Sequence, residues 1–202
     1  MKGLKIEISR VSPKSLDILW EDTLFRTVSK GLFSRELKGL QPHLTYPEFL
    51  AAFALIESKV GRRYAIYLLS QRALLGAELQ EKLVAKGLSL AIAEQVVAYC
   101  KKMGYINDAG ETKRRVAKEL KKGRSMRATR YKLMQKKGVD ETALQEALQN
   151  AGPTEEEALQ KQLAKYAKKI DLKDREERRK LLAKLCRQGF SIDSVFKAFD
   201  DF

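Results

Sequence analysis

The spacing of apolar residues changes character once along the chain, close to residue 45. Before that point apolar and polar residues alternate, which is the period of a half-buried β-strand. The alternating segments are Leu4 to Ile8, Leu16 to Trp20 and Leu24 to Val28. Glu21-Asp22 separates the last two and predicts a turn. We therefore expect a β-containing element over residues 1–44.

After Pro47 the apolar period becomes that of a helix. Phe49, Phe53 and Ile56 fall on one helical face. Thr45 is placed to cap this helix, and Glu48 follows three residues later, as a capping box requires. The pattern predicts a linking helix over residues 45–62 and no strand beyond it.

An internal repeat covers the rest of the chain. Gly87, Gly138 and Gly189 are separated by 51 residues each time, and they lie in the similar phrases KLVAKGLS, KLMQKKGVD and KLCRQGFS. Each glycine can adopt the left-handed conformation that closes a helix, with a basic residue before it near the negative end of the helix dipole. An apolar residue and then an N-cap residue follow each glycine. In the three copies the basic, apolar and capping residues are Lys86, Leu88, Ser89; Lys137, Val139, Asp140; and Arg187, Phe190, Ser191.

Helices with apolar faces are predicted on both sides of each glycine. Apolar residues stand six, nine and ten positions after it, and others stand in a helix of about ten residues before it. The downstream positions are Ala93, Val96, Val97; Leu144, Ala147, Leu148; and Val195, Ala198, Phe199. The upstream positions are Leu79, Leu83; Leu133, Met134; and Leu181, Leu185.

A further helix precedes each pair, so the repeating unit has three helices. Such units are too small to be robust alone and lean on their neighbours. We predict a mainly all-α fold, with three tandem three-helix repeats in an elongated curved array after the β-containing element. Gly104 with Asn107–Gly110, and Gly152-Pro153, are expected to break the helices between units. The predicted repeats are residues 63–108, 109–153 and 154–202.

The net charge of +14 indicates an acidic partner, and its distribution indicates where that partner binds. The stretch from Lys113 to Lys137 holds twelve basic residues and one acidic residue, Glu119. Solvated helix faces usually intersperse glutamate with lysine, so we interpret this stretch as an anion-binding surface of phosphate or carboxylate contacts. The predicted binding residues are Arg114, Arg115, Lys118, Lys121, Lys122, Arg124, Arg127, Arg130, Lys132, Lys136 and Lys137.

The sequence holds no constellation typical of a catalytic or metal site. His43 is the only histidine, no phosphate-binding loop motif is present, and Cys100 and Cys186 stand apart from any metal-ligand spacing. We expect neither an enzyme nor a cofactor. The absence of a long apolar stretch and of a signal-peptide pattern predicts a cytoplasmic protein without a transmembrane helix.

Three phrases carry a resemblance to a known family: AELQEKLVAKG (Ala77–Gly87), GYIND (Gly104–Asp108) and RQGFSIDSVFKAF (Arg187–Phe199). On these the chain from about Arg63 to Phe202 resembles the RecX regulatory proteins, which are built from three tandem three-helix repeats. Many members also carry a short β-element before the repeats. The chain departs from the family pattern in the second repeat, where Glu111-Thr112 replace an aromatic-Ala pair and Arg130 occupies an apolar position.

The resemblance implies a protein that lies along the groove of the RecA–DNA filament, bridges its protomers and contacts DNA. We expect this chain to be a monomer. The resemblance also implies restraint of strand exchange, ATP hydrolysis and LexA co-cleavage, with single-stranded and double-stranded DNA bound without sequence preference. The alternative is a non-specific nucleic-acid-binding repeat protein that does not depend on RecA. A peripheral membrane protein fits less well, because the basic stretch lacks an exposed apolar face.

Overall fold

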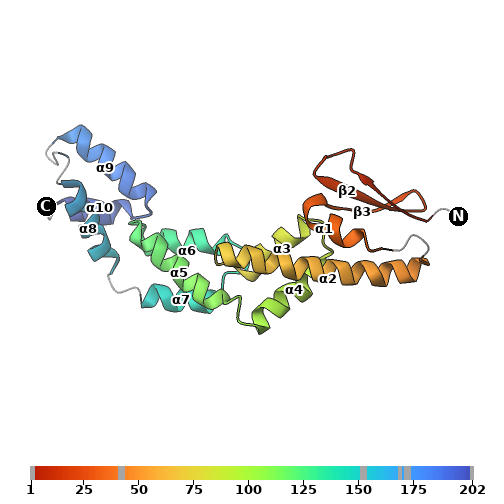
Figure 1. The fold of residues 1–202 in the computed structure, drawn as a ribbon. Coiled ribbons are helices and arrows are strands. Elements are labelled where there is room, and N and C mark those ends of the chain that lie inside the picture. The colour runs from red at the N-terminus through yellow and green to blue at the C-terminus, as the bar shows by residue number, and fades with distance from the viewer. Residues whose placement is uncertain (1–2, 41–43, 151–153, 168–169, 171–173, 201–202) are drawn as a thin grey trace. The chain divides into compact units, whose positions relative to one another are not determined.

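The computed structural model describes residues 3–40, 44–150, 154–167, 170 and 174–200. The chain separates into two units, Met1–Asn107 and Asp108–Phe202. The predicted class is confirmed, since the described residues form a small N-terminal sheet followed by helices (Figure 1). The elements of unit 1 are β1 (Leu4–Ile8), β2 (Ser15–Trp20), β3 (Thr23–Ser29), α1 (Lys30–Leu37), α2 (Tyr46–Gln71), α3 (Gly76–Val84) and α4 (Leu90–Lys102). Those of unit 2 are α5 (Asp108–Lys121), α6 (Met126–Met134), α7 (Glu141–Gln149), α8 (Glu155–Ala167), α9 (Arg175–Arg187) and α10 (Ile192–Asp200).

The three predicted strands form an antiparallel sheet in the order β1-β2-β3. Glu21 and Asp22 make the tight turn between β2 and β3 with positive φ values of 49° and 63°, as a two-residue hairpin turn requires. Leu16, Ile18 and Val28 are buried on the inner face of the sheet. Alternation along the sequence was therefore sufficient to locate this sheet.

Helix α2 supplies the platform under the sheet. It begins with the predicted capping box, in which the Thr45 backbone N–H donates to Glu48 at 2.8 Å. Phe49 and Phe53 are fully buried and meet the edge of Phe25 from β3, with ring centroids 5.1 and 5.4 Å apart. The helix continues to Gln71, nine residues beyond the predicted linking segment.

A buried carboxylate on α2, which the apolar pattern did not predict, joins three elements of unit 1. Glu57 is 4% exposed and accepts a hydrogen bond from Arg26 of β3 at 2.5 Å and one from the Ser89 backbone N–H at 2.6 Å. Ser89 is the N-cap of α4, so this single side chain ties β3, α2 and α4 together. A buried charge of this kind is tolerated because both of its oxygens are hydrogen-bonded.

Helix α1 was also not predicted, because Lys30–Leu37 was assigned to the β-containing element. Phe33 and Leu37 lie four residues apart and turn one face of α1 into the core. The opposite face carries lysine and arginine. One helical turn of apolar residues is too short a pattern to distinguish from a loop in sequence.

The corner at Gly87 is where the helical part of unit 1 meets the sheet. Gly87 has a φ of +95°, and a Cβ there would lie 2.5 Å from the Thr27 carbonyl oxygen and 2.6 Å from the Val28 Cα. The backbone N–H of Ser29, the N-cap of α1, donates to the Lys86 carbonyl oxygen at 3.0 Å. The corner therefore needs glycine both for its backbone conformation and for the close approach of two chain segments.

The corner at Gly189 repeats this arrangement inside unit 2. A Cβ on Gly189, whose φ is +96°, would overlap the Cβ of Ala128 on α6. The backbone N–H of Ser125, the N-cap of α6, donates to the Gln188 carbonyl oxygen at 3.0 Å. In both units, then, the carbonyl before the glycine accepts the N–H of a serine that caps another helix.

The predicted caps and most of the predicted buried faces are confirmed. Ser89, Asp140 and Ser191 each accept a backbone N–H from the first turn of the following helix. Met134, Ala147 and Leu148 were predicted to be buried and are not. Met134 is 41% exposed and the other two are half-buried, because the core of α5–α7 is a small cluster centred on Val116, Leu133 and Leu144.

The predicted helix break over Asn107–Gly110 is wrong at its C-terminal end. Helix α5 begins at Asp108, so Gly110 lies in its first turn. The break is made earlier by Gly104, which follows the end of α4 with a φ of +72°. Gly152-Pro153, the other predicted break, lies outside the described residues. None of the described helices is long and apolar enough to span a membrane.

We expect Gly87→Ala to destabilise the protein by about 3 kcal/mol or more, because it adds a backbone overlap to the cost of a left-handed residue. Gly104→Ala is the matched control, since its φ is also positive but its added Cβ would meet nothing within 4 Å. That control should cost only about 1–2 kcal/mol. Urea denaturation of both variants measures the difference, and equal losses would show that the corner is not closely packed.

Candidate nucleic-acid interface

All eleven residues predicted to bind an anion lie in unit 2, on α5, α6 and the segments that follow them. Their apolar counterparts face the core as predicted, since Val116 is buried and Leu120 packs against it. The cationic side chains differ sharply in their surroundings. Five of them are hydrogen-bonded to one of two buried carboxylates, and this separates a structural group from an open group.

Glu119, the one acidic residue of the basic stretch, is a buried hub. Its side chain is 9% exposed and pairs with Lys122 at 2.7 Å, Arg124 at 2.8 Å and Lys132 at 2.7 Å. These three cations come from the end of α5, the following loop and α6. Burial on its own raises the pKa of Glu119, but the hydrogen bonds and charges of Lys122 and Lys132 outweigh it and lower the pKa to about 2.

A second buried carboxylate stands in the first turn of α5. Glu111 is 5% exposed and accepts hydrogen bonds from Arg114 at 2.6 Å and Arg115 at 2.7 Å. Burial raises its pKa, and the two guanidinium groups more than reverse that effect, so the pKa stays below its usual range. Glu111, which stands in place of an aromatic residue in this repeat, thus has hydrogen-bond partners on its own helix.

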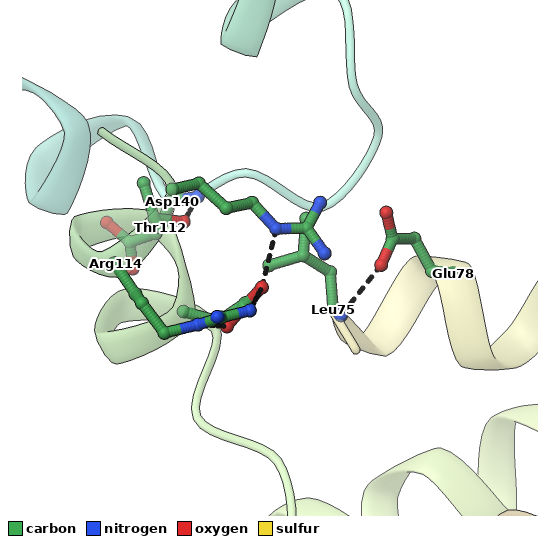
Figure 2. A network of polar contacts seen from close by, with 7 residues as sticks. Leu75, Glu78, Thr112, Arg114 and Asp140 are labelled. Carbon is green, nitrogen blue, oxygen red and sulfur yellow. Dashed lines mark hydrogen bonds and ion pairs between the residues drawn. The ribbon is translucent and has the colours of Figure 1, made fainter. Parts of the chain in front are cut away.

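Thr112, the other polar replacement, is fully buried and also has a partner. Its hydroxyl oxygen accepts the backbone N–H of Asp140, the N-cap of α7, at 3.2 Å. Figure 2 shows the two residues side by side, with Arg114 on the same helix as Thr112. The contact joins the start of α5 to the start of α7. A hydrogen bond here takes the place of the apolar packing that an alanine would give.

These pairs correct the electrostatic argument made from sequence. The basic stretch was expected to lack carboxylate partners, and it has two that are buried: Glu119 and, just before it, Glu111. A third carboxylate, the exposed Glu146, pairs with Lys113 at 2.8 Å. Half of the twelve basic residues are therefore paired with a carboxylate and are less free to contact a ligand.

The remaining cations form the open basic set, which we define as Lys118, Lys121, Arg127, Arg130 and Lys136. Each side chain is exposed, and within the described part of the chain none has a carboxylate at ion-pair distance. Lys137 is also exposed but has a polar contact of its own. Two members lie on α5 and two on α6, three residues apart in each case, so each pair shares a helix face.

The face of α6 that carries Arg127 and Arg130 also exposes apolar surface. Tyr131 is 71% exposed and Met134 is 41% exposed, at helical spacing from the two arginines. All four residues line a hollow of about 900 Å³ that reaches Phe190 beside the Gly189 corner. Sequence reasoning missed Tyr131, because a tyrosine among apolar neighbours is more often at the rim of a core.

No feature of the described residues supports catalysis or metal binding. No group of three or more potential metal-ligating side chains occurs among them. Cys100 and Cys186 are unpaired thiols, and burial raises the pKa of Cys100, which makes that thiol less reactive. His43 lies outside the described residues. The exposed cations, Tyr131 and Met134 can bind a ligand through charge, hydrogen bonds and apolar contact.

Comparison with known proteins identifies a family. Residues 154–199 match the family described as RecX, third three-helix domain. The regulatory protein RecX of Caldanaerobacter subterraneus subsp. tengcongensis is 30% identical over 146 residues, which cover 72% of each chain. The regulatory protein RecX of Vibrio parahaemolyticus serotype O3:K6 is 32% identical over 143 residues, covering 70% of this chain and 92% of that one.

Two solved structures share the fold at low sequence identity. A crystal structure of regulatory protein RecX matches with a TM-score of 0.60 and 18% identity, and the match covers 100% of both chains. The structure of RecX from Lactobacillus salivarius matches with a TM-score of 0.56 and 18% identity, covering 72% of this chain and 98% of that one.

The buried Glu119 hub predicts an acid-sensitive stability. Because the folded pKa of about 2 lies below the ordinary value of 4.5, the stabilisation is complete above pH 4.5 and is lost as the pH falls toward 2. We expect Glu119→Gln to lower the free energy of unfolding by on the order of 2 kcal/mol at pH 7. The difference between variant and wild type should shrink steadily below pH 4.5.

Glu146→Gln is the matched control for this measurement. Glu146 and Lys113 are each 51% exposed, so their ion pair contributes at most about 1 kcal/mol. Urea denaturation at about pH 7, 4 and 3 measures the free energy of unfolding of the two variants. The stabilising role of Glu119 would be contradicted if Glu119→Gln lowered the free energy of unfolding no more than the control does, or if its effect did not depend on pH.

Two fully buried threonines of unit 2 offer a test of the Thr112 contact. Thr112→Val removes a hydroxyl that serves the Asp140 N–H, so it should cost about 1–3 kcal/mol. Thr129→Val removes a hydroxyl that has no hydrogen-bond partner among the described residues, so it should be neutral or stabilising. Thermal denaturation compares the two variants. A larger loss of stability in Thr129→Val than in Thr112→Val would contradict a stabilising Thr112–Asp140 hydrogen bond.

Proposed function

Because the chain belongs to the RecX family of regulatory proteins, we propose that it binds the RecA–DNA filament and lowers its recombinase, ATP-hydrolysing and co-protease activities. It acts as a monomer in the cytoplasm and works by binding alone. The hydrolysed ATP is bound by RecA. The regulatory role is that of the family, and the open basic set supports the mode of action.

The observation that carries the proposal is the open basic set on α5 and α6. Its five cations have no internal carboxylate, so each gains when it displaces counterions from a phosphate backbone. Lysine and arginine at helical spacing contact phosphates without selecting bases. This supports binding to single-stranded and double-stranded DNA without sequence preference, which suits a protein that acts wherever a filament has formed.

The neighbouring apolar surface suits a composite target of nucleic acid and protein. Tyr131 and Met134 stand beside Arg127 and Arg130 on α6. An exposed tyrosine can stack on an unpaired base, and a methionine can fill an irregular apolar contact on a protein. A surface that carries both charge and apolar groups is better matched to a filament than to naked duplex DNA.

The alternative function is non-specific nucleic-acid binding that does not involve RecA. It would use the same cations and show the same dependence on salt. The two functions differ in stoichiometry, because a filament regulator acts at concentrations too low to coat the DNA.

The test is the rate of ATP hydrolysis by RecA from the same organism on single-stranded DNA, with this protein titrated far below the amount that covers the strand. We expect the wild-type protein to lower the rate. Arg127→Glu/Arg130→Glu should raise the concentration needed for half of this effect by about tenfold or more, since each good contact contributes on the order of 1 kcal/mol and reversal adds repulsion. Neither side chain has an ion pair to lose.

Lys161→Glu/Lys165→Glu is the matched control. Both lysines are exposed on α8 of the same unit, and reversing them changes the net charge by the same amount. The control should remain within about twofold of the wild type if position matters more than total charge. An unchanged rate at every concentration, together with clear DNA binding, would leave the RecA-independent function as the correct one.

A further inference from the structure

A second basic surface lies in unit 1, outside the basic stretch from Lys113 to Lys137. A hollow of about 910 Å³ opens between β2–β3, α1 and the corner that follows α3. Five exposed cationic side chains line it: Lys14, Lys30, Arg35, Lys38 and Lys86. We call this set the α1 hollow. Residues from three separate segments meet here, which explains why no charge run marks it in the sequence.

Backbone hydrogen bonds hold three of these lysines together. The Lys30 N–H donates to the Lys14 carbonyl oxygen at 2.9 Å. The N–H of the adjacent Ser29 donates to the Lys86 carbonyl oxygen at 3.0 Å. The main chains at positions 14, 30 and 86 are therefore fixed beside one another, so three cationic side chains start from neighbouring points of the backbone.

Helix α1 presents a uniformly basic face to the hollow. Phe33 and Leu37 fill its inner face, and Leu32 packs against the same core. Lys30, Arg35 and Lys38 line the hollow with Ser34 and Gly31 between them. A Cβ added at Gly31 would meet nothing within 4 Å, so a ligand can approach the backbone closely.

The carboxylates near α1 are committed elsewhere. Glu36 turns to the other side of the helix and pairs with Lys59 at 2.8 Å and Arg63 at 2.9 Å. Asp17 on β2 accepts the Thr27 hydroxyl at 2.6 Å. Among the described residues no carboxylate lines the hollow, and none of its five cations has an ion pair. This contrasts with α5, α6 and the loop between them, where five cations pair with the two buried glutamates Glu111 and Glu119.

We propose that the α1 hollow binds consecutive phosphates of a nucleic-acid strand. Its lining offers five cations and the Ser15 hydroxyl but few apolar anchors for a peptide side chain. The Ser34 hydroxyl already donates to the Lys30 carbonyl oxygen at 2.6 Å. Lys30 and Lys38 stand about 12 Å apart along α1. Several successive phosphates, about 3.4 Å apart along the axis of one duplex strand, span that distance, whereas a single phosphate ion cannot.

This site is separate from the open basic set and does not depend on RecA. It gives the chain two nucleic-acid contacts, one in each unit. Its failure can therefore be distinguished from failure of the proposed function, because it is measured on DNA alone and with the basic residues of unit 2 intact.

The experiment measures binding of the full chain to a labelled oligothymidine strand by fluorescence anisotropy, from about 50 to 200 mM salt. Lys14→Gln/Lys30→Gln should reduce the slope of log K against log salt by about 1.4, which is about 0.7 for each lost single-strand contact. The affinity near 0.1 M salt should fall by on the order of tenfold. Both side chains are exposed and the backbone hydrogen bonds remain, so the urea midpoint should not change.

Arg72→Gln/Lys102→Gln is the control, since both side chains are exposed in unit 1, lie outside the hollow and remove the same charge. Its slope should match the wild type. Equal losses in the two variants would mean that only net charge matters, and no loss in either would mean that DNA does not reach the hollow; both overturn the proposal. Inorganic phosphate or pyrophosphate that stabilises the wild type but not Lys14→Gln/Lys30→Gln, without a change in DNA binding, would make this a small-anion site and would also overturn it.

Discussion

The fold depends on a backbone joint in which one chain segment rests on a glycine corner of another. In unit 1 the Lys86 carbonyl accepts the Ser29 N–H and Gly87 lies against β3; in unit 2 the Gln188 carbonyl accepts the Ser125 N–H and Gly189 lies against α6. The accepting group is in each case the residue before a left-handed glycine. The N-terminal sheet and α1 are thus attached to the first repeat by the same joint that attaches the third repeat to the second.

That equivalence gives the N-terminal element a structural purpose. A terminal unit of a repeat protein exposes a surface that an adjoining unit would otherwise bury. Here Ser29 and Val28 occupy, at Gly87, the places that Ser125 and Ala128 occupy at Gly189. The sheet covers the first corner and the buried Glu57 fastens it to α2 and α4. It acts as a cap for the helical part of unit 1.

Local patterns in the sequence predicted the strands, helices and caps. Contacts between distant segments decided which charged side chains are paired or buried. Alternation located the sheet, and the glycine spacing located the corners with their caps at Ser89 and Asp140, because these features depend on neighbouring residues. The burial of Glu119 could not be predicted, since a lone acid in a basic run is expected at the surface. The meeting of Lys14 with Lys86 was equally hidden, because it is created by pairing of the backbone across the fold. The eleven predicted site residues therefore divide into structural and open groups that only the structure separates.

The backbone joint also bears on how such proteins diverge. A contact made by a carbonyl, an N–H and the absence of a Cβ places little demand on which side chains surround it. Selection can then hold a few glycines and capping residues while the remaining surface drifts, and a solved RecX structure keeps the fold across its whole length at 18% identity. This chain accommodates the polar Glu111 and Thr112 at the start of α5 through hydrogen bonds to Arg114, Arg115 and the Asp140 N–H, and the helices around them keep their places.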